Sequence, residues 1–198
     1  QHNEETMTLR VSGKNLDVGE ALRSKAEGQF DAVIKKYFDG GYTGHMTLEH
    51  EGSGFNAACS VHLDTGVVLQ AEAYGGDAIS AYQILTDTIE KRMRRYSRKL
   101  KQRRAPANGV DVALAAQSYV LQATDESEDE LAEDYSPPVI AETTKNLRQL
   151  SVEEAVMELD LTQGDVVVFR HAGHGGLNVV YRRADGNIGW IDPALKAN

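Results

Sequence analysis

The most regular segment of the chain is the run Ala78-Ile-Ser-Ala-Tyr-Gln-Ile-Leu-Thr-Asp-Thr-Ile-Glu-Lys-Arg-Met-Arg-Arg-Tyr-Ser-Arg-Lys-Leu100. Its apolar residues recur at spacings of three and four, which is the period of an amphipathic α-helix. They are Ala78, Tyr82, Leu85, Ile89, Met93, Tyr96 and Leu100. Asp77, directly before the run, is a typical N-cap residue. The pattern predicts one continuous helix that reaches Arg104 and packs on a core through a single apolar stripe.

The residues before this helix predict a sheet and a second helix. Thr8–Ser12 alternates polar and apolar residues, as a strand does. The helical spacing from Val18 to Phe38 predicts a helix, with Asp17 as its expected N-cap. The apolar faces of three further strands consist of Met46 and Leu48, of Ala57, Cys59, Val61 and Leu63, and of Val67, Leu69, Ala71 and Ala73. The order β-α-β-β-β-α predicts an N-terminal domain with both helices on one face of a sheet.

The middle of the chain has a different composition. Residues 105–140 contain eight acidic residues, no basic residue and three of the four prolines. Segments of this kind bury too little apolar surface to offset the entropy of ordering. We therefore expect a flexible, mostly disordered acidic linker over residues 105–142, with a weak tendency towards a short helix at Val112–Leu121.

The last part of the chain predicts a small α/β domain over residues 143–195. Ser151 and Glu154 have the spacing of a capping box, which begins a helix. Three strands are expected after it, at Val166–His171, Leu177–Arg183 and Ile188–Asp192. A core of about 55 residues is thin for a free monomer, so the apolar face of this domain is expected to pair with a second copy, or, as the alternative, to pack within its own domain. The chain as a whole is expected to be α+β, with the N-terminal domain at residues 7–104.

Positive charge is concentrated at the end of the long helix. The fourteen residues from Lys91 to Arg104 contain nine Lys or Arg and no acid, although the chain carries a net charge of -9. At about 100° per residue, seven of the nine lie away from the apolar stripe. Such a surface is typical of contact with a polyanion, because Arg and Lys pair with phosphate oxygens. An acidic protein surface, the chain's own Asp125–Glu130 or a merely solvated face are the alternatives.

Other candidate sites have simpler interpretations. Cys59 is the single cysteine, which excludes an internal disulfide and a multi-cysteine zinc site. His45, His50 and His62 alternate with apolar residues and are expected to be exposed rather than to bind metal. The loop Ala172-Gly-His-Gly-Gly176 joins two strands and begins no helix, so it predicts a turn rather than a phosphate site. We expect no enzyme activity, no cofactor and no metal.

The sequence also sets expectations for location. No apolar run approaches the ~20 residues of a membrane helix. Residues 1–6 lack the pattern of a signal peptide, and Met7 is the expected natural start. We expect a cytoplasmic protein with no membrane contact and no small-molecule substrate.

Two groups of motifs resemble one known family. In the N-terminal half they are Ser12-Gly-Lys-Asn-Leu16, Glu20-Ala-Leu-Arg23 and Ile89-Glu-Lys-Arg-Met93. In the C-terminal half they are Leu150-Ser-Val-Glu-Glu-Ala-Val-Met157, Val168-Phe-Arg170, Asn178-Val-Val-Tyr-Arg-Arg183, Asp185-Gly-Asn187 and Ile191-Asp-Pro193. Over residues 7–104 and 143–193 the chain resembles the long-form ribosome hibernation promoting factors, of the ribosome-associated inhibitor and sigma-54 modulation protein family.

The resemblance implies a steric function. The N-terminal domain of the family binds the small ribosomal subunit where mRNA and tRNA would sit, and the C-terminal domain forms a homodimer that pairs two inactive ribosomes. It implies rRNA contacts for Arg23, Lys25, Lys91, Arg92, Arg94, Arg95, Arg98 and Lys99. It implies dimer contacts for Val168, Phe169, Val179, Val180 and Tyr181. The alternative function is that of a regulator whose basic helix docks on an acidic protein such as a transcription factor.

Overall fold

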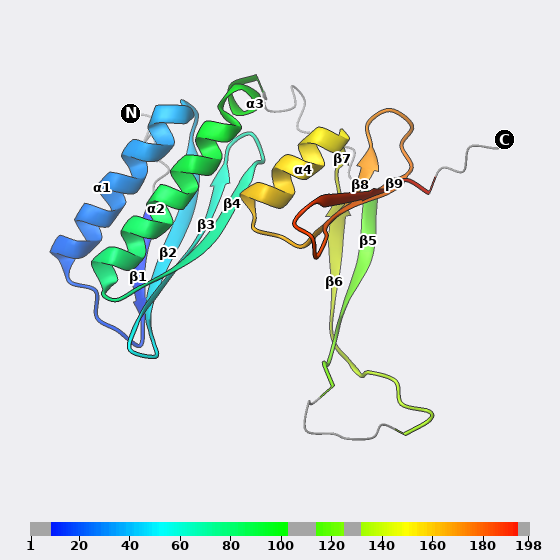
Figure 1. The fold of residues 1–198 in the computed structure, drawn as a ribbon, viewed down its shortest axis with the longest axis horizontal. Helices are drawn as coiled ribbons and strands as arrows, with labels where there is room; N and C mark the ends of the chain where they lie inside the picture. Colours follow the sequence, from blue (N-terminus) through cyan, green and yellow to red (C-terminus); the bar gives the residue numbers. More distant parts are fainter. Residues whose placement is uncertain (1–8, 103–113, 125–131, 194–198) are drawn as a thin grey trace, which may run out of the picture.

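The computed structural model describes residues 9–102, 114–124 and 132–193 of the chain. These residues form two units, each built on a four-stranded sheet, and a two-stranded ribbon that extends from the C-terminal unit (Figure 1). The mixed α+β architecture is the one that the sequence predicts.

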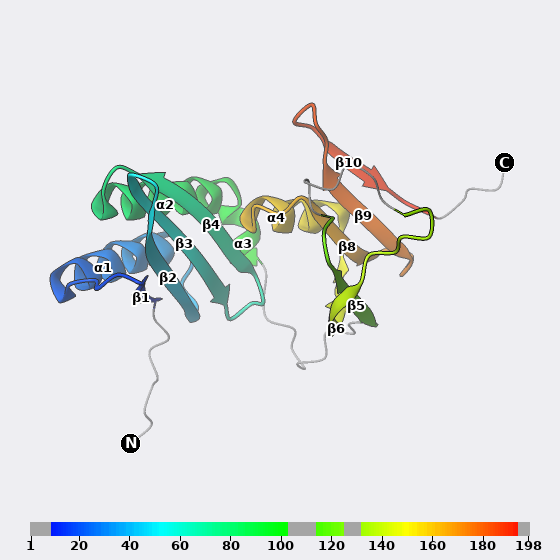
Figure 2. The ribbon, with the colours of Figure 1, turned by 90° about the horizontal axis from the view of Figure 1, so that it is seen from below.

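The N-terminal unit has the predicted order of elements. These are β1 (Leu9–Lys14), α1 (Glu20–Tyr37), β2 (Tyr42–Glu51), β3 (Gly54–Leu63), β4 (Val68–Gly75) and α2 (Ala78–Arg95). The sheet has the order β1-β2-β3-β4, in which β1 is parallel to β2 and the other pairs are antiparallel. Both helices cover the same face of this sheet, as Figure 2 shows from a second direction.

The N-terminal core lies between the sheet and its two helices. Met46 and Leu48 on β2 and Leu69 on β4 are completely buried, and their strand neighbours on the other face are more exposed. The period-two pattern of the sequence therefore identified the buried face correctly. Gly52 and Gly66 have positive φ angles of 58° and 84° in the turns that join these strands, a conformation that glycine adopts without a steric penalty.

Two details of the helices differ from the sequence prediction. The first helix begins at Glu20 rather than Val18, and its N-cap is Gly19, which forms no side-chain capping bond; the prediction of Asp17 as the cap is wrong. The long basic helix is interrupted at Tyr96 (φ -104°, ψ 13°) and continues as α3, Ser97–Gln102. Leu100 is still buried, so the apolar stripe continues across the break.

The described part of the middle region forms strands. β5 (Leu114–Leu121) pairs with β6 (Val139–Leu147) in antiparallel orientation, so the prediction of a short helix at Val112–Leu121 is wrong. The acidic, proline-containing composition of the region hid this signal. Tyr119, Val120 and Val139 are residue types that favour strands. The pairing extends into the stretch expected to be a disordered linker, whereas the acidic run Asp125–Glu130 lies outside the described residues.

The C-terminal unit contains β7 (Gln149–Leu150), α4 (Val152–Leu161), β8 (Val166–His171), β9 (Leu177–Arg182) and β10 (Ile188–Ile191). Its sheet has the order β10-β9-β8-β7, with β7 parallel to β8; the sequence had not indicated β7. Ser151 and Glu154 form the predicted capping box: the Glu154 amide donates to the Ser151 hydroxyl (3.1 Å) and the Ser151 amide to the Glu154 carboxylate (2.9 Å).

Candidate nucleic-acid interface

The cationic side chains on α2 and α3 are held outward by the burial of the opposite face. Ile89 and Met93 are completely buried and Leu100 is 1% exposed. Because side chains three and four residues apart share one helix face, several of the cations between these anchors point away from the core. Arg94, Arg95 and Arg98 are accordingly exposed.

Four of the eight predicted contact residues are exposed and have no bonding partner within the described part of the chain: Arg23, Lys25, Lys91 and Arg98. The structure separates them into two pairs. α1 and α2 run in the same direction, since Tyr37 at the end of α1 meets Glu90 and Arg94 late in α2. Arg23 and Lys25, in the first half of α1, therefore lie near the opposite end of the helix pair from Lys91 and Arg98. Figure 1 shows the two helices side by side.

Two further cations bond within the N-terminal unit. The Nε of Arg94 donates to the Tyr37 hydroxyl (3.3 Å), and its guanidinium lies 3.7 Å from Glu90. Arg92 is half-buried and donates to the carbonyl of Gln70 on β4 (2.9 Å). Burial lowers the pKa of Arg92, because water no longer fully solvates its charge.

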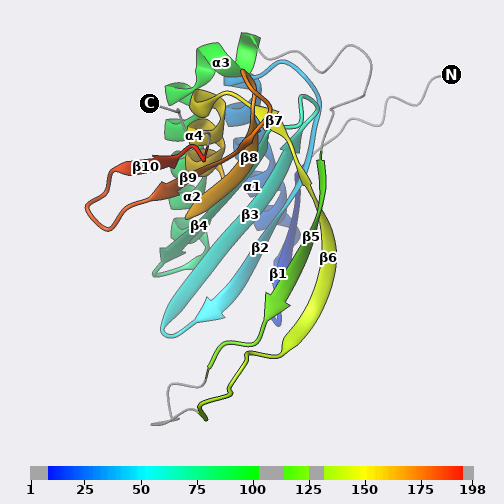
Figure 3. The ribbon, with the colours of Figure 1, turned by 90° about the vertical axis from the view of Figure 1, so that its right-hand side faces the viewer.

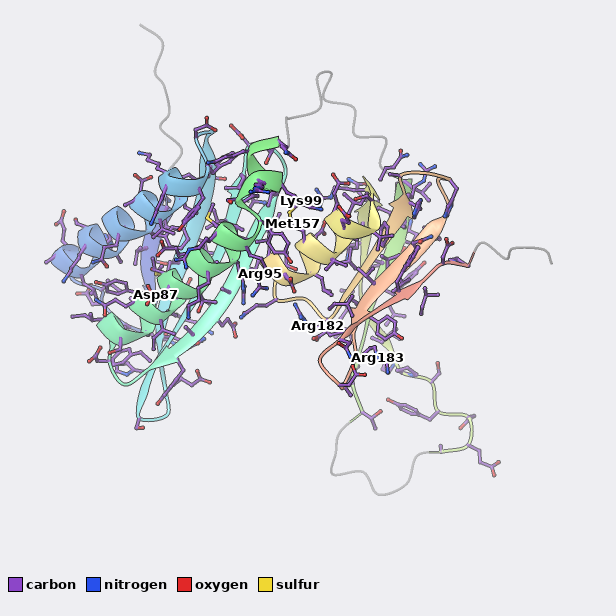
Figure 4. The ribbon with its side chains drawn as sticks, turned by 45° about the horizontal axis from the view of Figure 1, so that its top comes forward. Asp87, Arg95, Lys99, Met157, Arg182 and Arg183 are labelled. Carbon is purple, nitrogen blue, oxygen red and sulfur yellow. The ribbon has the colours of Figure 1, made fainter. Side chains whose placement is uncertain are left out.

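The last two cations are paired with acids on α4. Arg95 lies 3.5 Å from Asp160, and the ammonium of Lys99 lies 2.5 Å from the Glu153 carboxylate. Figure 4 shows Arg95 and Lys99 on the side of α2 and α3 that meets α4, close to Met157. The C-terminal unit thus covers one end of the predicted RNA-binding surface.

A cavity of about 590 Å³ opens where α2 meets the C-terminal unit. Its charged lining consists of Lys91, Arg92, Arg95, Asp160 and Arg182, and Thr88 and Gln163 complete it. Four cations thus surround one carboxylate. Burial opposes the charge of Asp160, but the Tyr96 and Arg182 hydrogen bonds and neighbouring cations outweigh it and lower the pKa of Asp160. The cavity remains cationic, which suits an anionic ligand rather than a metal ion.

The predicted dimer residues lie on two different faces of the C-terminal sheet. Phe169 and Val180 are completely buried under α4 and are not exposed to a second copy in this structure. Val168 is 41% exposed on the other face, where β8 register pairs it with Val179. Tyr181 shares that outer face, which Figure 3 presents from the side of β8 and β9. The outer face also carries Val166, Leu177 and Ile191, which the sequence prediction missed.

The remaining candidates do not form a reactive site. Cys59 is buried, and burial raises the pKa of its thiol to about 12. His50 packs on Phe55 at a centroid distance of 4.2 Å. Within the described ranges, no group of three potential metal ligands converges. No helix in those ranges combines the length and apolar character needed to cross a membrane.

Comparison with known proteins assigns the chain to a family. Residues 9–101 match the family described as sigma 54 modulation protein / S30EA ribosomal protein, and residues 134–189 match its C-terminal domain. The ribosome hibernation promotion factor of Bradyrhizobium diazoefficiens is 50% identical over 94% of this chain and 95% of its own length. This chain belongs to the family of ribosome hibernation promotion factors. The factor of Rhizobium meliloti, 47% identical over 95% of this chain and 98% of its own, agrees.

Membership of the hibernation-factor family confirms the resemblance seen in the sequence. It also confirms that the protein is not an enzyme, since the family is ribosome-associated and non-enzymatic. Among solved structures, the N-terminal domain of Thermus thermophilus Protein Y is similar, with 23% identity and a TM-score of 0.41 over 46% of this chain and 98% of that chain.

Tertiary contacts decide which cations of α1 lie near the basic end of α2. Lys36 lies 3.3 Å from Glu90 on α2, so it is better placed to extend the basic surface than Arg23 or Lys25. Its place at the end of α1 was visible in the sequence, but the direction of α1 relative to α2 was not. Glu153 and Asp160 gave no signal at all, because acids on a short helix are common on any surface.

Proposed function

We propose that this protein silences ribosomes by occupying the mRNA and tRNA channel of the small subunit, with α2 and α3 against rRNA phosphates. The observation that carries the proposal is the pair Lys91 and Arg98. Both are exposed cations without a partner in the described residues, on helices whose opposite face is anchored in the core. Held in place in this way, they are free to bind phosphate oxygens. Binding in the ribosome also places the protein in the cytoplasm.

Contacts of this kind supply affinity and position rather than sequence readout. Structured rRNA is recognised mainly by shape and backbone, and a cationic helix surface on a compact unit suits that mode. No chemical step is needed, because a bound protein excludes mRNA and tRNA by its volume.

We further propose that two copies pair through the outer face of the C-terminal sheet and so join two inactive ribosomes. Val166 and Leu177 are 55% and 45% exposed on this face. A two-fold axis would bury the same apolar patch on both copies. Val168, Val179 and Tyr181 complete the proposed contact.

The test measures binding to purified small subunits at several salt concentrations. Affinity should fall steeply with salt, with a slope of about -0.7 to -0.9 on a log-log plot for each phosphate contact. The double change Lys91→Glu with Arg98→Glu should abolish most binding and leave pairing intact. Arg10→Glu with Lys145→Glu makes the same change in net charge at exposed positions away from α2 and serves as the control.

Affinity that does not depend on salt would contradict the phosphate contacts. If the protein fails to bind small subunits but is recovered with an acidic protein after nuclease treatment, the alternative of a protein-binding regulator would replace the proposal.

A further inference from the structure

The outer face of α4 is packed against the basic helices of the same chain. Met157 and Leu161 are 2% and 0% exposed, and both belong to the hydrophobic core of the N-terminal unit rather than to that of their own unit. Their neighbours Ala155 and Leu159 instead face the C-terminal sheet with Phe169. Helix α4 is therefore apolar on two opposite sides, and the side with Met157 and Leu161 makes the contact between the units. Figure 2 shows α4 between the two sheets, and Figure 4 shows Met157 on the side that meets the N-terminal unit.

Polar contacts surround this apolar centre. Glu153 pairs with Lys99 (2.5 Å) at one end of α4, and Asp160 accepts from the Tyr96 hydroxyl and pairs with Arg95 (3.5 Å) near the other. The side chain of Gln163 accepts from the amide of Glu72 on the edge strand β4 (3.1 Å). These contacts fix α4 on α2, α3 and β4 at once.

We propose that α4 is an internal competitor of RNA for the basic surface, and that the protein must release its C-terminal unit to bind the ribosome. This inference rests on the proposed function. The carboxylates of Glu153 and Asp160 occupy places beside Lys99 and Arg95 that rRNA phosphates would take. Since a cation paired at this distance cannot also be fully bonded to phosphate, docking of α4 and full contact with RNA exclude each other.

The contact is well suited to reversal. Glu153 keeps 80% of its side-chain surface exposed in the pair with Lys99, and exposed ion pairs are individually weak. Met157 and Leu161 provide a small apolar area. The apparent dissociation constant for RNA is the intrinsic constant divided by the fraction of protein in the open state. Weakening the docking of α4 should therefore tighten RNA binding without any new contact to RNA.

The consequence is a link between the two ends of the chain. In the free protein, α4 shields Arg95 and Lys99. On the ribosome, the C-terminal unit is detached and free to orient its outer sheet face towards a second copy.

Variants of α4 in the full-length protein test the competition. Glu153→Lys and, separately, the uncharged change Met157→Gln should each tighten binding to purified small subunits by roughly three- to tenfold, by raising the open fraction. Glu142→Lys changes the net charge as Glu153→Lys does but lies on the exposed ribbon strand β6, and it should change affinity much less. Unchanged or weaker binding by both folded α4 variants would overturn the inference.

Carbodiimide cross-linking provides a second measurement on the unaltered chain. Lys99 and Glu153 are close enough for a direct amide cross-link, which mass spectrometry identifies in the peptides. The cross-link should form in the free protein and fall at least several-fold when small subunits are saturating. If the protein binds subunits but the cross-link persists, the competition is wrong and the proposed function stands. If the protein binds no subunits at all, the proposed function fails as well.

Discussion

Asp160 illustrates how single residues acquire a role through their neighbours. Its carboxylate receives the Tyr96 hydroxyl from the N-terminal unit and the guanidinium of Arg182, at 3.0 Å, from its own unit. Tyr96 had been predicted only as part of an apolar stripe. Its hydroxyl now has a partner 64 residues away, a relation that no local pattern encodes.

The lowered pKa of Asp160 predicts a pH dependence. An ordinary Asp has a pKa of about 3.9 in an unfolded chain. Because the pKa of Asp160 is lower in the folded than in the unfolded state, its ionised carboxylate stabilises the fold fully at a pH above the unfolded pKa. This contribution is lost as the pH falls through the folded pKa. Asp160→Asn should lower the melting temperature near neutral pH and give a flatter decline below about pH 4. Thermal unfolding across pH checks this, with the exposed Asp165→Asn as control; equal declines in both variants would contradict it.

The buried thiol of Cys59 predicts low reactivity. Its pKa of about 12 leaves very little thiolate near pH 8, and the thiolate is the reactive form. A thiol reagent should modify the native protein much more slowly than the urea-unfolded protein. Rapid stoichiometric labelling of the folded chain would show that Cys59 is accessible.

At the scale of elements, two of the three predicted helix caps are present in the structure. The capping box of α4 and the cap of Asp77 on α2, whose carboxylate accepts from the Ser80 amide at 2.7 Å, are both confirmed. The cap predicted for α1 failed because Asp17 lies too early in the chain to bond the first turn, which begins at Glu20. An Asp or Ser residue therefore identifies an N-cap only where the first residue of the helix is also known.

The capping box gives a prediction for stability. Ser151→Ala removes the acceptor for the Glu154 amide and should cost about 1 kcal/mol in the free energy of unfolding. Denaturant unfolding measures it. Ser24→Ala is the control: it makes the same Ser-to-Ala change at an exposed position within α1 that is not a cap. It should leave the free energy of unfolding unchanged or slightly higher. An equal loss in both variants would remove the capping explanation.

At the scale of the whole molecule, the C-terminal sheet divides the predicted dimer residues by function. Phe169 supports the fold beneath α4, while Val168 and Val179 lie on the outer face. Neighbours in sequence alternate between the two faces of a strand, so a list of adjacent residues necessarily mixed both roles.

This division predicts different outcomes for neighbouring substitutions. Val168→Asp with Val179→Asp should give a folded monomer, because charge on the outer face opposes pairing. Phe169→Ala should instead destabilise the C-terminal unit by about 3–5 kcal/mol, since it leaves a cavity in the core. Sedimentation and thermal unfolding of both variants distinguish the cases, and a stable dimer of the double variant would exclude the outer face as the pairing surface.

Local spacing was sufficient for the main helices and strands of both units and for the burial of their faces, because period and burial are tied by backbone geometry; it did not indicate the two-residue strand β7 or the break at Tyr96. The concentration of cations on one helix face follows from the same geometry. Contacts between distant residues settled which cations are available: Lys91 and Arg98 are free in the described structure, whereas Arg95 and Lys99 meet acids some 50 to 65 residues further along the chain. Charge pairing depends on distance in space, and a sequence read one segment at a time contains no such distance.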